Sequence, residues 1–145
     1  MLQNILHFGF TKGREEYGVL FLRLLIGAFI IHGVADNVFS WTHMVEFQKF
    51  LAARGVPASM FAAHLSAYAQ FICGLSILFG AFIRLTSIVF IINFIAAIVI
   101  AHLGQSFRQM FPALIMIAAG LFFLFHGAGP LSVDAWLQRR KLTNA

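Results

Sequence analysis

The stretch that decides the fold of this chain is Leu85–Leu103, which reads LTSIVFIINFIAAIVIAHL. It holds no Asp, Glu, Lys or Arg, and its apolar residues run continuously rather than in alternation. A helix that crosses a bilayer needs ~20 mostly apolar residues, and in lipid only a helix or a closed barrel satisfies its own backbone polar groups. A barrel would require shorter strands of alternating polarity. The stretch therefore predicts a transmembrane helix.

Three further apolar stretches are long enough to cross a bilayer. They are Tyr17–Ala35, Ser66–Ile83 and Gln109–His126. Only a tight turn fits between the second and third spans, at residues 83–86, so these two spans should form a hairpin. The sequence thus predicts an all-α integral membrane four-helix bundle, with residues 1–145 forming a single membrane domain.

The composition agrees with a membrane location. Hydrophobic residues make up 61% of the chain and charged residues 10%, whereas soluble domains have ~45–50% and ~25%. These fractions exclude an ordinary soluble globule, a disordered chain and a nucleic-acid-binding arm, despite a net charge of +5. We interpret the Lys and Arg residues as topology signals and as contacts to lipid headgroups. The single cysteine, Cys73, allows no internal disulfide and should be an inert packing residue.

The connection between the first two spans predicts a short interfacial helix. Its apolar residues recur at helical spacing at Met44, Phe47, Phe50 and Leu51. Trp41 stands at the start of this segment, and tryptophan is enriched at membrane–water interfaces. Gly55-Val56-Pro57 should end the helix and turn the chain towards the second span.

The distribution of Lys and Arg predicts the orientation, because cytoplasmic loops carry an excess of these residues. Four spans place both termini on one side. That side carries six of them: Lys12, Arg14, Arg84, Arg139, Arg140 and Lys141. The other side carries three: Lys49, Arg54 and Arg108. We therefore expect a multi-pass protein with both termini in the cytoplasm.

Four polar residues should lie near the outer face of the membrane, and we call them the outer polar cluster: His32, Asp36, Gln70 and His102. His32 and Asp36 are four residues apart, so they share a helix face and can pair. The cluster fits a pocket that binds a polar headgroup or a quinone ring, or a hydrogen-bonded plug that only ties the helix ends together. Two histidines on different spans are the minimum for haem, which we do not expect, and no metal site is predicted.

A second group, the inner polar cluster, should lie near the cytoplasmic face: Arg23, Arg84, His126 and Asp134. Arg23 lies within the first span and should snorkel to the headgroups. Asp134 follows the fourth span and should pair with Arg23 or Arg84. Such a carboxylate would clamp the helix ends together, or the cluster would hold an anionic headgroup.

Small residues should mark the helix contacts, since lipid tails are as apolar as leucine and close packing must hold the bundle together. The candidates are Gly27, Gly33, Gly74, Ser76, Gly80, Ala97, Ala101, Ala118, Ala119 and Gly120.

A series of short motifs resembles the DoxX family of small four-span membrane proteins. In order, these are Arg23-x-x-x-Gly27, His32-Gly33, Gly55-Val56-Pro57, Gly74, Gly80-x-x-x-Arg84, His102 and Gly129-Pro130-Leu131-Ser132-Val133-Asp134. The resemblance implies a four-helix bundle in a prokaryotic cytoplasmic membrane, and the family is named for a subunit of a thiosulfate:quinone oxidoreductase. Asp36 stands where the family often has Lys, and Gln70 where many members have Glu.

The resemblance and the polar clusters together favour a redox-associated subunit that binds quinone or lipid between its helices and docks a catalytic partner. If the chain takes part in catalysis, it does so as a subunit of a membrane oxidoreductase. The alternative is a non-catalytic assembly factor or anchor for a partner protein. A small-solute transporter is a third hypothesis, but four spans would need to oligomerise. Expected partners are the bilayer, a membrane or soluble oxidoreductase subunit and a second copy of the chain, but no nucleic acid. A thiol–quinone exchanger is excluded, because it needs two reactive cysteines.

Overall fold

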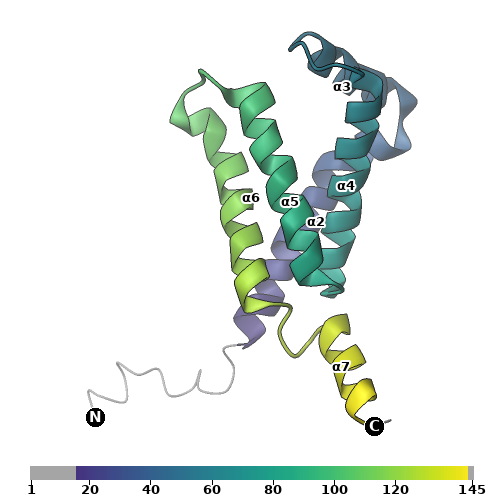
Figure 1. The fold of residues 1–145 in the computed structure, drawn as a ribbon, viewed down its shortest axis with the longest axis vertical. Helices are drawn as coiled ribbons and strands as arrows, with labels where there is room; N and C mark the ends of the chain where they lie inside the picture. Colours follow the sequence, from purple (N-terminus) through teal and green to yellow (C-terminus); the bar gives the residue numbers. More distant parts are fainter. Residues whose placement is uncertain (1–15, 144–145) are drawn as a thin grey trace, which may run out of the picture.

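The fold is an all-α bundle with four helices long and apolar enough to cross a membrane. The computed structural model describes residues 16–143, and that part contains no strand. The four long helices are α2 (Glu16–Phe39), α4 (Ser59–Phe79), α5 with its continuation η2 (Ile83–His102) and α6 (Phe107–His126) (Figure 1). The described residues also form two shorter helices, α3 (Trp41–Ala52) and α7 (Val133–Thr143). The predicted four-span bundle and the helix between the first two spans are confirmed.

The two ends of the bundle are named after their short helices, α3 at one end and α7 at the other (Figure 1). The chain enters α2 at the α7 end and returns there between α4 and α5 and again after α6. Lys12 and Arg14, which contribute to the predicted charge bias, lie outside the described residues.

The second span differs most from its predicted position. The helix begins at Ser59 rather than near Ser66, and it ends at Phe79 rather than at Ile83. Gly80 follows with a φ of 67°, the left-handed conformation that commonly ends helices at glycine. The hairpin turn therefore occupies residues 80–82, earlier than predicted, and α5 already begins at Ile83.

Helices α2 and α4 cross where two glycines face each other. A Cβ added to Gly27 would lie 3.0 Å from the carbonyl oxygen of Gly74, and one added to Gly74 would lie 2.8 Å from Cγ1 of Ile31. Gly120 of α6 is packed in the same way against Ile91 of α5, at 2.7 Å. These contacts confirm that glycines mediate close helix packing in this bundle.

Gly33 was predicted to be such a contact, and this prediction is wrong. A Cβ added there would have no atom outside its own helix within 4 Å. Gly33 lies on the exposed side of α2, whereas Gly27 lies on the buried side. Helical spacing names possible interfaces but does not say which face meets a neighbour.

Gly27 and Gly33 together give a matched test of the α2–α4 contact. We expect Gly27→Leu to lower the free energy of unfolding by about 1–3 kcal/mol, because the larger side chain must push the helices apart. Gly33→Leu makes the same change in helix propensity without a clash, so its thermal midpoint in detergent should stay near that of the wild type. Equal midpoints for the two variants would contradict the assigned contact.

Helix α3 packs on α4 through one face. Met44 and Leu51 are buried, with 2% and 6% of their surface exposed, and they cluster with Ala63 and Ala67. The predicted apolar positions of α3 are therefore confirmed in part, since Phe50 is exposed.

Two features of the backbone were not predicted. The third span ends in a π-helical turn, Ile98–His102, and near this end α5 and α6 diverge from α4 (Figure 1). The polar tail that contains Arg139 and Arg140 forms helix α7.

Candidate functional site

Arg23 binds backbone carbonyls inside the bundle instead of snorkelling. Only 2% of its surface is exposed. Its Nε donates to the carbonyl of Ile77 at 3.0 Å and one terminal nitrogen to Leu78 at 3.1 Å. The other terminal nitrogen donates to Ala128 at 2.7 Å and to Leu131 at 2.9 Å. Carbonyls in the last turn of a helix lack helical partners, so the guanidinium satisfies the end of α4 and ties it to the chain that follows α6.

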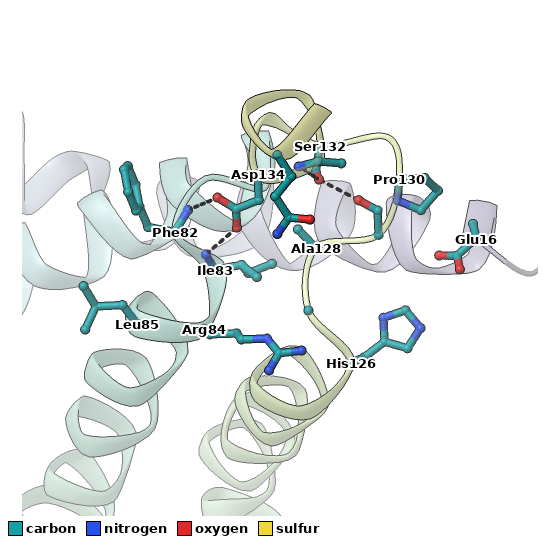
Figure 2. A pocket seen from close by; sticks show the side chains of 14 residues that line it. Glu16, Phe82, Ile83, Arg84, Leu85, His126, Ala128, Pro130, Ser132 and Asp134 are labelled. Carbon is teal, nitrogen blue, oxygen red and sulfur yellow. Dashed lines mark hydrogen bonds between the residues drawn. The ribbon is translucent and has the colours of Figure 1, made fainter. Parts of the chain in front are cut away.

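Asp134 caps α5 instead of pairing with an arginine. Its Oδ1 accepts a hydrogen bond from the amide of Phe82 at 2.7 Å, and its Oδ2 accepts one from the amide of Ile83 at 3.0 Å (Figure 2). No ion pair joins Asp134 to Arg23 or Arg84 within the described part of the chain, so the predicted pairing is wrong. The first amides of a helix need acceptors, and the hairpin turn presents two of them to this carboxylate.

The hairpin turn is packed tightly against these two residues. The carbonyl of Gly80 accepts a hydrogen bond from the amide of Asp134 at 3.0 Å. A Cβ added to Gly80 would lie 2.6 Å from Cβ of Ser132 and 2.7 Å from Cζ of Arg23. The hydroxyl of Ser132 donates to the carbonyl of Gly129 at 2.6 Å. We call Arg23, the turn 80–82 and the segment 128–134 the Arg23 junction.

A polar cleft opens beside the Arg23 junction at the α7 end (Figure 2). Its volume is about 580 Å³, and the start of α2, the start of α5, the end of α6 and α7 all contribute to its walls. Its ionisable side chains are Glu16, Arg84, His126 and Asp134. Three of the four members of the predicted inner polar cluster, Arg84, His126 and Asp134, therefore line this cleft, and Arg23 does not.

No hydrogen bond joins any two members of the outer polar cluster, all of which belong to the described residues. His32 and Asp36 are both exposed on α2. Gln70 donates to the hydroxyl of Ser66 at 3.1 Å, and Nδ1 of His102 lies 2.8 Å from Oε1 of Gln105. A ligand-binding role for these four residues stays a prediction.

A mostly apolar groove lies between α3, α4 and α5, with a volume of about 360 Å³. Its walls include Phe47, Phe50 and Ile92. Its polar lining residues are Ser66 and Asn93, and Nδ2 of Asn93 donates to the hydroxyl of Ser66 at 3.1 Å. Because Gln70 donates to the same hydroxyl, one residue of the outer polar cluster is linked to the groove.

The sequence shows the polar residues of this groove but does not show that they lie together. Ser66 and Gln70 are four residues apart on one helix, and Asn93 is an isolated amide in the middle of the third span. Polar residues within spans often hydrogen-bond across helices. The spacing alone could not show that α4 and α5 place these groups together.

Among the described residues, no group of three His, Cys, Asp or Glu side chains could hold a metal ion.

These features describe a multi-pass membrane protein in a lipid bilayer, with a mostly apolar groove between α3, α4 and α5 and a cleft at the α7 end. The sequence model of the DoxX family matches residues 18–103, which is more than half of the chain. The protein therefore belongs to the DoxX family. No curated protein matches the chain, and no solved structure does.

Proposed function

We propose that this protein is a redox-associated membrane subunit that binds a quinone in the groove between α3, α4 and α5. A membrane-bound or soluble partner subunit carries the redox centre in this proposal. The protein lies in a prokaryotic cytoplasmic membrane, with the α7 end and both termini on the cytoplasmic side, as the excess of Lys and Arg favours.

The observation that carries this proposal is an amide donor in the wall of a mostly apolar groove. Asn93 has two N–H groups, and one donates to Ser66. The second can donate to a carbonyl oxygen of a ligand. A quinone has two ring carbonyls on an apolar body, so it fits this combination of donor and walls. A plain acyl chain needs the apolar walls but not the donor.

The size and depth of the groove support the same ligand class. Its volume of about 360 Å³ falls within the ~300–1,000 Å³ that is usual for small-molecule sites. Asn93 follows Ile83, the first residue of α5, by ten positions, which places it ~15 Å along the helix axis. That is close to the middle of a ~30 Å hydrocarbon core, where the isoprenoid tail of a quinone dissolves.

The test is the quinone content of the purified protein. We expect wild-type protein to retain quinone through purification, and Asn93→Leu to retain about tenfold less, because a buried carbonyl without a donor costs ~1–3 kcal/mol. The measurement is chromatography of the solvent extract, expressed as quinone per protein.

Asn37→Leu is the matched control, since it removes the same side chain from α2 outside the groove. It should leave the quinone content unchanged. Wild-type protein without quinone, or equal loss in both variants, would contradict the proposal and favour the assembly factor or anchor.

A further inference from the structure

We propose that the cleft at the α7 end binds the headgroup of a zwitterionic phospholipid that carries a primary amine, of the phosphatidylethanolamine class. This site is separate from the groove and does not depend on the quinone proposal. The charged side chains of the cleft, its position at the level of the lipid headgroups and the apolar residues at its edge all favour such a ligand.

The cleft offers a cation for a phosphate. Arg84 belongs to the first turn of α5, and its side chain extends to the end of α6. A Cβ added to Gly127 would lie 3.7 Å from Nε of Arg84 and 3.7 Å from one of its terminal nitrogens. Within the described part of the chain, the Arg84 guanidinium makes no hydrogen bond and no ion pair. Arginine binds phosphate oxygens with two parallel hydrogen bonds, so it suits a phosphodiester. His126 lines the same cleft and can add a further donor.

The cleft also contains a carboxylate for an amine. Both oxygens of Asp134 accept backbone amides, so this residue is already committed to the cap of α5. Glu16 lines the cleft from the start of α2, and its Oε2 lies against Gly129. In Figure 2, His126 lies between Arg84 and Glu16. A headgroup with one negative and one positive charge matches this pair, whereas a headgroup with only negative charge is repelled by Glu16.

The position and the edge of the cleft favour a lipid over a soluble phosphate. The cleft lies where α5 begins and α6 ends, at the level where a four-span bundle meets the headgroup region. Phe82 and Leu85 line it and are 67% and 66% exposed. These two side chains offer an apolar surface to acyl chains, next to the polar groups that hold the headgroup.

The experiment is native mass spectrometry of the full-length protein in detergent with phosphatidylethanolamine or phosphatidylglycerol. We expect wild-type protein to retain phosphatidylethanolamine about fivefold more than phosphatidylglycerol. Arg84→Gln should lower retention of phosphatidylethanolamine about tenfold, because it removes the charged hydrogen bonds to the phosphate. Glu16→Gln should reduce or reverse the preference for the amine-bearing lipid, because the repulsion of phosphatidylglycerol is lost.

Arg140→Gln is the control, since Arg140 stacks on Trp136 of α7 and does not line the cleft. It should retain both lipids as the wild type does. Unchanged retention in Arg84→Gln, or a wild-type preference for phosphatidylglycerol, would overturn the proposal.

Competition with soluble phosphoethanolamine shows whether the site binds a lipid or a soluble phosphate compound. If it displaces the lipid at equal concentration, the site belongs to a free phosphate compound and the lipid assignment is wrong.

Discussion

Replacing Arg23 with Met should cost more stability than the loss of any other charged side chain in the bundle. The variant removes the donor from the carbonyls of Leu78, Ala128 and Leu131. It leaves the carbonyl of Ile77 with the amide of Gly80 alone. A hydrogen bond to a charged group contributes ~1.5–3 kcal/mol, and the four bonds share one side chain, so their energies do not simply add. We expect a loss of about 3–5 kcal/mol, seen as little monodisperse protein and a large drop of the thermal midpoint in detergent.

Two further variants show whether the guanidinium, rather than its charge alone, is required. Arg23→Lys keeps the charge but offers a compact ammonium in place of the planar fork, so it should recover only part of the stability. Arg54→Met is the control, because Arg54 is exposed and, among the described residues, its guanidinium donates only to the carbonyl of Phe50, whose ring it also covers. A thermal midpoint of Arg23→Met equal to that of Arg54→Met would show that the Arg23 junction does not stabilise the bundle.

Gly80→Val should be the most damaging substitution of a glycine. Gly80 has a φ of 67°, a region that costs an L-residue roughly 1–2 kcal/mol, and more when the residue is β-branched. A Cβ there would also overlap Ser132 at 2.6 Å and the guanidinium carbon of Arg23 at 2.7 Å. Both groups are held by hydrogen bonds, so relieving the overlap breaks the Arg23 junction. We expect a loss of about 3 kcal/mol or more in the free energy of unfolding.

Gly104→Val separates backbone strain from the steric overlap. Gly104 also has a positive φ, 84°, but a Cβ there would meet nothing within 4 Å. Its variant should therefore lose only the strain contribution. The measurement is the thermal midpoint of both variants in the same detergent. Equal losses would mean that the packing of the turn against Arg23 contributes nothing.

The existence of each span was predictable, and the partners of the charged residues were not. The absence of charge in Leu85–Leu103 was enough to predict a helix, since lipid offers its backbone no other partner. Arg23 and Asp134 carry opposite charges, so electrostatics favoured an ion pair between them. In the structure, each binds backbone groups instead. Every residue has a carbonyl, so no sequence pattern shows which carbonyls a turn leaves without partners.

The candidate groove was also predictable only in part. Asn93, Ser66 and Gln70 were visible as polar residues within spans, and Gln70 was part of the outer polar cluster. Depth along each helix could be estimated from the rise per residue. The rotation of each helix about its axis could not, and that rotation decides that Asn93 faces Ser66.

The sequence by itself determined that residues 16–126 hold four segments long and apolar enough to cross a membrane, because length and apolar character are local properties of the sequence. It also determined the family, through the match over residues 18–103. Only the tertiary structure decided that Arg23 ties the end of α4 to the chain that follows α6, and that Asp134 caps α5 across the hairpin. Both arrangements depend on backbone groups that become available only when the helix ends meet, so they are properties of the assembled bundle.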